Sequence, residues 1–325
     1  MAHAAHPDED WGNARGRSAD KPRDIPAPGW RDILFRVKDR IKRDNLSIIS
    51  AGVAFYALLA IFPGLIALIG LYGLAFDPHQ ITEHLSALTS ILPGEAAQLI
   101  GDQLAEVATM EKTSLSVGAI VAVLVALWSA SAGMRTLMTA LDVAYAEEET
   151  RGMFRFYGTS LLLTFGAIIG GLVAIGTVVV VPVLLKFLGL SEAMENVLAY
   201  ARWPLLAGVM LVGLAIVYRY GPDREKPQWR WVSWGAVFAT LLWIIGSALF
   251  SLYVTQFGDY NKTYGSMGAV IILMTWFLLT AYVFLIGAEI NAEMERQTRK
   301  DTTDAKGRPL GQRGAHAADT VGHTP

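Results

Sequence analysis

The chain has 325 residues, of which 53% are hydrophobic and only 17% are charged, and its formal net charge is −2. This composition is too apolar for an ordinary soluble domain of that length. The sequence contains no cysteine, which excludes disulfides, thiolate catalysis and cysteine-ligated metals.

Residues 1–30 are rich in Asp, Arg, Ala and Pro and show no apolar periodicity, so we expect a disordered cytoplasmic tail. The next segment, 31–43, carries apolar residues on one helical face and basic residues around the others. The apolar positions are Ile33, Leu34, Val37 and Ile41. We expect an amphipathic helix in the cytoplasmic membrane interface, where it orients the first span and binds anionic lipid headgroups.

Six long segments with little or no charge follow, and each is long enough to cross a hydrocarbon core of roughly 30 Å. They are 46–76, 113–134, 156–185, 197–218, 231–258 and 263–288. Pro63 in the first and Pro182 in the third remove a backbone donor, so we expect both helices to kink. The sequence thus predicts an all-α, polytopic membrane domain over 31–296 with six transmembrane helices.

The longest loop between spans, 77–112, keeps a helical spacing of apolar residues on both sides of Pro93-Gly94. We expect two short amphipathic helices there, which form an acidic hairpin on the outer side between spans one and two. The hairpin either rests on the membrane or covers a cavity between the spans.

The basic residues are distributed unevenly among the segments between spans. Of 27 Lys and Arg residues, 23 lie in the two tails and in the loops around 135–155 and 219–230. The positive-inside rule places these segments in the cytoplasm, so we predict that both termini are cytoplasmic. The C-terminal segment 297–325 resembles the N-terminal tail in composition, and we expect it to be disordered as well.

Small residues notch several spans and predict close helix packing. Gly166 and Gly170 form a GxxxG pair in span three, and Ser129 and Gly133 form a similar pair in span two. Such notches let helix backbones approach and gain van der Waals contact in lipid. They serve packing within the bundle, and they are also compatible with a homo-oligomer.

Arg135 is the one charge near the cytoplasmic end of span two, roughly 10 Å before Asp142 at 1.5 Å per residue. Its side chain tilts toward the bilayer centre, which hinders simple snorkelling, so it needs a partner. Glu289 lies at a comparable depth in span six, and we therefore predict an Arg135–Glu289 pair. Thr136, Thr139 or Asn291 would complete its hydrogen bonds.

The predicted pair leaves three roles open. It gates or lines a substrate path, it is a static clasp, or Arg135 instead caps backbone carbonyls freed elsewhere. Asp142 is included in the candidate site, and Glu289 is the group available for ion coupling. The candidate intramembrane polar site therefore comprises Arg135, Thr139, Asp142, Glu289 and Asn291.

The sequence lacks the motifs expected of an enzyme. It shows no Walker-type glycine loop, no nucleophile elbow and no pair of carboxylates placed within a plausible cleft. All six histidines lie in the tails or the outer loop, without the spacing of a metal site. We expect no catalytic residues, no cofactor and no metal.

Three stretches resemble the YihY/BrkB family of bacterial inner-membrane proteins. They are DNLSIISAGVAFYALLAIFPG (44–64), WSASAGMRTLMTALDVAY (128–145) and YGSMGAVIILMTWFLLTAYVFLIGAEINAE (264–293). The resemblance covers roughly 31–296 and implies a six-helix integral membrane fold. Members of this family have been labelled ribonuclease BN-like, virulence-associated or transporters, and at the position of Asp142 they more often carry Asn.

These features favour a multi-pass protein of the bacterial inner membrane that acts as a transporter or flippase for a lipidic or amphipathic substrate. The alternative is a non-transporting scaffold that organises an envelope assembly through its tails and small-residue faces. We expect membrane lipids, especially anionic headgroups at the cytoplasmic face, as partners, and no nucleic acid. A ribonuclease would need catalytic groups facing water and a basic groove, which the sequence does not offer.

Overall fold

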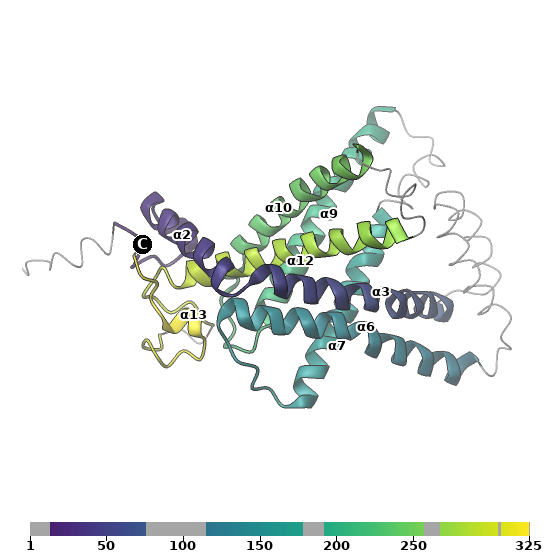
Figure 1. Ribbon diagram of the computed structural model, residues 1–325, viewed down its shortest axis with the longest axis horizontal. Coiled ribbons are helices and arrows are strands. Elements are labelled where there is room, and N and C mark those ends of the chain that lie inside the picture. Colours follow the sequence, from purple (N-terminus) through teal and green to yellow (C-terminus); the bar gives the residue numbers. More distant parts are fainter. Residues whose placement is uncertain (1–13, 76–114, 178–191, 257–266, 305–306, 325) are drawn as a thin grey trace, which may run out of the picture.

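A computed structural model describes residues 14–75, 115–177, 192–256, 267–304 and 307–324 (Figure 1). Every regular element in these ranges is a helix, which confirms the all-α class. The elements are η1 (Pro22–Asp24), α2 (Ala27–Arg43), α3 (Leu46–Ala75), α6 (Leu115–Tyr145), α7 (Met153–Ile175), α9 (Glu192–Tyr220), α10 (Trp229–Gln256), α12 (Met267–Glu295) and α13 (His316–Asp319).

Five of these helices are long and apolar enough to cross a membrane, and the bent pair α2 and α3 makes a sixth if it is counted as one span. The two axes of that pair meet at 66°. Asn45 lies at the break with a φ of 50°, a left-handed conformation that Asn adopts more readily than most residues. The chain therefore turns sharply between an amphipathic helix and the first long apolar one.

The long helices are arranged so that each packs against the next in the chain, and α12 returns to α3. The helices α10 and α12 cross closely, because a Cβ added to Gly235 would lie 2.2 Å from the Gly287 carbonyl oxygen. The expected notch at Gly133 is confirmed, since its Cβ would lie 3.4 Å from Ala60 Cβ on α3. A Cβ on Gly166 would meet nothing within 4 Å, so that glycine does not mark a tight contact among the described residues.

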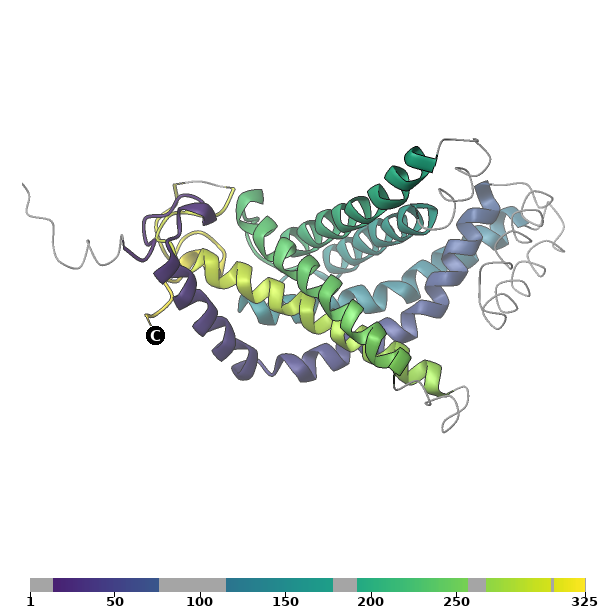
Figure 2. The same ribbon diagram turned by 90° about the horizontal axis from the view of Figure 1, so that it is seen from above.

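Burial is concentrated at one end of the bundle. On α10 no described side chain beyond Thr240 is buried, and on α9 burial begins only at Leu214. On α12 the described residues before Ala281 are unburied except Gly268. The packed half of these three helices is the half that adjoins α2 and α13 (Figures 1 and 2).

The described parts of both terminal segments fold together, which corrects the expectation that they are disordered. We call residues 14–26 together with 297–304 and 307–324 the end lobe. The Thr298 hydroxyl donates to the Ala19 carbonyl at 2.7 Å, and Arg17 donates to the Gly322 carbonyl at 2.6 Å. Composition alone misled the prediction, because small and polar residues here bury through hydrogen bonds to backbone carbonyls rather than through apolar periodicity.

The two loops that carry many of the basic residues, around 135–155 and 219–230, contact the end lobe. Glu225 donates its N–H to the Gly314 carbonyl at 2.8 Å, and the His316 N–H donates to the Glu147 carboxylate at 2.7 Å. All four segments predicted to be cytoplasmic thus lie at the same end of the helices. Which side of the membrane this end faces stays a prediction.

The helix predicted over 31–43 forms as part of α2, but its apolar face has a different role. Ile33 and Val37 are buried against Ile290 and Met294 of α12, while Leu34 is 59% exposed. The inner face of α2 therefore belongs to the protein core, and only its outer face is free to meet a membrane surface.

Two expectations lie wholly outside the described residues, namely the outer hairpin over 77–112 and the kink at Pro182. Pro63 lies inside α3, which continues on both sides of it, so the kink there stays a prediction. Pro204 is a further proline within a helix, α9.

Candidate functional site

A ladder of buried ion pairs fastens α2 to α12 at the packed end. Arg36 Nε lies 2.5 Å from Glu293 Oε2, and Arg40 Nε lies 3.4 Å from Glu289 Oε2. Both glutamate side chains are fully buried. Because the two arginines are four residues apart on α2 and the two glutamates four apart on α12, the helices pair antiparallel along matching faces.

Arg36 is the most highly connected residue of this ladder. Besides Glu293, its guanidinium donates to Gln297 Oε1 at 2.6 Å and to the His323 carbonyl at 3.1 Å. The second oxygen of Glu293 accepts from Arg296 at 2.5 Å. Arg36 thereby links α2, α12 and the end lobe in one network whose charges are paired, as burial requires.

A second buried pair lies beside the loop between α9 and α10. Arg224 Nη2 lies 2.6 Å from Glu295 Oε2, and the Arg224 guanidinium carbon sits 4.8 Å from the centre of the Tyr145 ring. The Thr302 hydroxyl donates to the same glutamate at 2.7 Å. A polar hollow of about 430 Å³ adjoins this pair, lined by Thr150, Arg155, Asp223, Arg224, Glu225, Lys226 and Gly314.

Acidic groups next to this hollow have unequal surroundings. The Asp223 N–H donates to Asp142 Oδ1 at 2.7 Å, while Asp142 Oδ2 is buried without a hydrogen bond. Burial would raise the pKa of Asp223, but bonds from the Thr150 hydroxyl and N–H outweigh it and lower that pKa. For Glu147 burial dominates over the His316 N–H bond and raises the pKa to about 7.

Asn291 joins three helices. Its Oδ1 accepts the Gly235 N–H at 2.8 Å, and its Nδ2 donates to the Val232 carbonyl at 3.1 Å and to the Tyr145 hydroxyl at 3.3 Å. It is fully buried. Since both ends of its amide are in use, Asn291 acts as a structural clasp among α6, α10 and α12.

Arg135 does not pair with Glu289, so that prediction is wrong. Among the described residues the guanidinium makes no ion pair; it donates to Ser131 Oγ and lies over two aromatic rings. The ring centres are 5.4 Å away for Trp128 and 4.9 Å away for Tyr157, and the two rings stack on each other. The prediction failed because it compared the depths of the two residues along their helices and did not consider which face of the helix each side chain occupies. Glu289 faces α2, and Arg135 faces α7.

The threonines near Arg135 do not complete a polar site. The Thr136 hydroxyl donates to the Ala132 carbonyl at 3.0 Å, and the Thr139 hydroxyl donates to the Arg135 carbonyl at 3.2 Å. Both bonds stay within α6, and Thr139 is exposed. The predicted site is therefore distributed over three places: Arg135, Asp142 beside the polar hollow, and Glu289 with Asn291 at α12.

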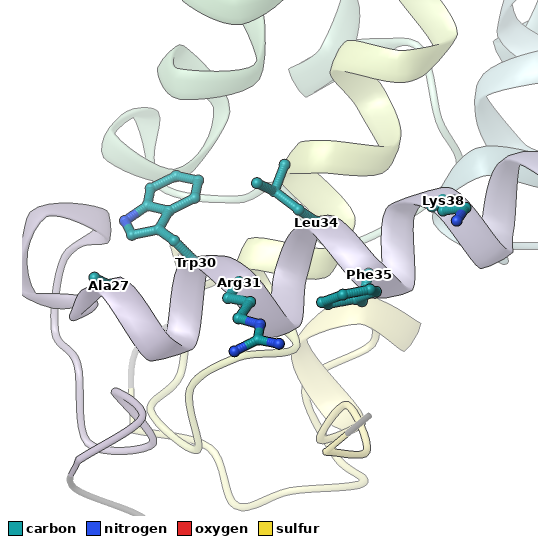
Figure 3. A pocket seen from close by; sticks show the side chains of 6 residues that line it. All are labelled: Ala27, Trp30, Arg31, Leu34, Phe35 and Lys38. Carbon is teal, nitrogen blue, oxygen red and sulfur yellow. The ribbon is translucent and has the colours of Figure 1, made fainter.

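The outer face of α2 carries a shallow groove of about 610 Å³. Figure 3 shows the side chains along it, where two basic groups, Arg31 and Lys38, lie among apolar ones. They are Ala27, Trp30, Arg31, Leu34, Phe35 and Lys38. The guanidinium carbon of Arg31 lies 5.6 Å from the centre of the Phe35 ring. A face of this kind fits the boundary between acyl chains and headgroups.

Sequence reasoning missed Arg36, Arg40 and Glu293 as a matched set. The signal was present as two i, i+4 spacings, one basic in the amphipathic segment and one acidic near the end of the last span. Arg224 with Glu295 had no comparable signal, because Arg224 is one of four adjacent charged residues, 223–226, in a short loop and nothing in the sequence singles out its partner. Among the described residues no group of three His, Asp or Glu side chains is placed to hold a metal ion.

Comparison with known proteins identifies relatives of this chain. Residues 37–310 match the family described as Virulence factor BrkB. A ribonuclease-like protein of Bacillus subtilis, YfkH, is 34% identical over 258 residues, which covers 77% of this chain and 90% of that protein. A UPF0761 membrane protein of Idiomarina loihiensis is 26% identical over 261 residues, covering 79% and 88%. No solved structure matches the chain.

Proposed function

This chain belongs to the BrkB family of multi-pass bacterial membrane proteins, and on that premise we propose that it moves a lipidic or amphipathic molecule across the membrane. The observation that carries the proposal is the unequal burial along the bundle. One end is packed and cross-linked by ion pairs, and among the described residues α9, α10 and α12 have few buried side chains toward the other.

The less buried half offers apolar surface rather than a polar channel. On α10 the exposed side chains include Ile245, Leu249 and Leu252, which are 56–61% exposed. Such surfaces can contact acyl chains directly, which suits a substrate that is itself apolar along most of its length. A hydrophilic solute would instead need hydrogen-bonding groups along its path.

The packed half supplies the part of a transporter that must open and close. Glu289 is fully buried, and its Oε1 has no hydrogen bond, although Arg40 holds the other oxygen. A buried carboxylate with an unused oxygen at membrane depth is a group that can couple ion binding to movement of α2 against α12.

The test is lipid movement in proteoliposomes that contain the purified chain. We expect fluorescent phospholipid in the inner leaflet to reach an outside quencher faster with protein than in protein-free vesicles. Glu289→Gln should slow this movement, and Glu148→Gln, an exposed loop carboxylate, should not. Equal quenching with and without protein for anionic, zwitterionic and single-chain lipids would exclude the transport role.

The end lobe favours a second candidate, a non-transporting scaffold. A folded lobe built from both chain ends presents a fixed surface outside the spans, which a scaffold needs for its partners. The same vesicle experiment separates the two, because a scaffold leaves the lipid distribution unchanged. Deleting residues 307–325 would then impair assembly partners while flux stays absent.

The name of the Bacillus subtilis relative contains the word ribonuclease, and we do not extend that activity to this chain. The carboxylates of the packed end are held by arginines, as in Glu293 with Arg36 and Glu295 with Arg224. A phosphodiester hydrolase needs acids, bases or metal ligands free to meet water and substrate.

We also propose that the outer face of α2 rests among anionic lipid headgroups. The 66° bend directs α2 away from the line of α3, so that it can lie along the membrane while α3 crosses it. Leu34 and Phe35 would enter the acyl boundary, and Arg31 and Lys38 would meet phosphates.

A further inference from the structure

Arg135 is a cation inside a membrane span whose charge is not neutralised by the described part of the chain. It lies ten residues before Tyr145, the last residue of α6, or about 15 Å along the helix. No described carboxylate comes within ion-pair distance of it. An unpaired arginine at such a depth is rare and marks a functional site.

The surroundings of Arg135 hold its charge in place without occupying its hydrogen-bonding fork. Trp128 and Tyr157 stack with ring centres 4.8 Å apart, and the guanidinium lies over both rings. These contacts stabilise a cation by attraction to the ring faces. A guanidinium has five N–H donors, and the side chain of Ser131 accepts from one nitrogen only.

The neighbouring surface of α6 is apolar and open. Leu124 and Val125 are each 59% exposed, and Trp128 is 49% exposed. These residues lie toward the less buried end of the helix, about two to three turns from Arg135. A ligand bound at Arg135 can therefore extend a hydrocarbon chain along α6 without displacing protein side chains.

We propose that Arg135 binds the phosphate group of an anionic amphiphile, with its chain along Leu124 and Val125. A planar guanidinium matches two phosphate oxygens with parallel N–H bonds, which no lysine can do. The inference rests on the proposed function and narrows its substrate class to phosphate-bearing lipids. Free inorganic phosphate shares the headgroup chemistry, and the experiment separates the two sources.

The experiment titrates the purified full chain in detergent with phosphatidylglycerol, diacylglycerol or inorganic phosphate and counts bound molecules by native mass spectrometry. We expect the tightest-bound phosphatidylglycerol to bind Arg135→Gln at least about tenfold more weakly than the natural chain, because the variant loses a charge-assisted hydrogen bond. Arg135→Lys should retain part of the affinity. Arg202→Gln is the matched control, because Arg202 also lies over a tryptophan, Trp203, at 5.4 Å.

Several outcomes overturn the inference. Unchanged phosphatidylglycerol affinity in Arg135→Gln, or equal affinity for diacylglycerol, excludes a phosphate site at Arg135, and binding of inorganic phosphate alone excludes the amphiphile. If Arg135→Gln does not fold, Arg135→Lys with undiminished affinity overturns it as well. Flux that is unaffected by Arg135→Gln refutes this inference and leaves the proposed function standing. Tight, Arg135-dependent binding without any flux refutes the proposed function and leaves the phosphate site at Arg135 standing.

Discussion

At the scale of single residues, Glu147 is a carboxyl group poised to titrate near neutral pH. It follows α6 and accepts the His316 N–H, so it connects a loop to the end lobe. Burial raises its pKa from 4.5 to about 7, while the His316 bond and Arg224 oppose that rise. The folded state therefore holds a proton on Glu147 more strongly than the unfolded chain does.

This shift predicts a pH-dependent contribution to stability. A raised carboxyl pKa stabilises the fold fully below pH 4.5, and that contribution is lost as pH rises through about 7. We expect Glu147→Gln, which keeps an acceptor for His316, to gain in melting temperature relative to the natural chain between pH 5 and pH 8. Glu148→Gln, at an exposed position, is the control. Parallel pH profiles for all three proteins would contradict the assignment.

The Arg36–Glu293 pair predicts non-additive mutations. Arg36→Met leaves Glu293 buried with Arg296 as its remaining ion-pair partner among the described residues, and breaking a buried pair costs about 3–5 kcal/mol. The double change Arg36→Met with Glu293→Gln removes the stranded charge and should recover part of that loss. Thermal unfolding in detergent measures both. Losses that simply add would show that the two groups do not interact.

At the scale of elements, the crossing of α10 and α12 depends on two glycines. A Cβ on Gly235 would lie 2.5 Å from the Asn291 side chain as well as against the Gly287 backbone. We expect Gly235→Ala to destabilise the protein by about 1–3 kcal/mol through overpacking. Gly246→Ala is a matched control on the same helix, where the nearest atom is 3.4 Å away on Leu279. Equal melting temperatures for both variants would mean that α10 and α12 have room for a methyl group at Gly235.

The outer face of α2 allows a direct test of membrane contact, because the chain has no cysteine and a single one can be labelled. We expect a polarity-sensitive dye on Leu34→Cys to shift to the blue in anionic proteoliposomes and to be quenched by nitroxide lipids. Asp39→Cys, also exposed but turned away around the helix, should remain in water. The same emission at both positions would place α2 away from the bilayer.

The elements show where local sequence suffices and where it does not. Charge-free length predicted the long helices, because backbone groups inside a bilayer must bond within one segment. The amphipathic period of α2 predicted a helix but not which apolar residues it buries, since Ile33 and Leu34 are equivalent by hydropathy. Only the approach of α12, a distant element, separates them. The Arg135–Glu289 prediction failed for the same reason, because helix rotation depends on packing partners.

At the scale of the whole molecule, the charge distribution predicted which segments gather together, and the end lobe brings them into contact. Disorder was predicted for the tails because their composition lacks apolar periodicity. Arg17, Thr298 and Arg313 instead satisfy backbone carbonyls across the lobe, and Arg313 alone reaches Arg308, Lys300, Ala318 and Arg299. Pairings of this kind follow from tertiary structure and leave no period in the sequence.

The side of the membrane that the packed end faces is predicted from the basic residues. Single cysteines at Glu148 and Lys300, both exposed, should react with an impermeant reagent only after the inner membrane is opened. Cysteines at positions 112, 190 and 260 should react in intact spheroplasts. Reaction of position 300 from outside would reverse the topology.

The ladder between α2 and α12 also sets an order of events during synthesis. Arg36 and Glu293 are 257 residues apart in the chain. At about 5–20 residues per second, α2 leaves the ribosome roughly 13–50 s before its partner exists. Throughout that interval Arg36 lacks Glu293 and the apolar face of α2 lacks Ile290 and Met294, so both must wait for the last span before this part of the fold can close.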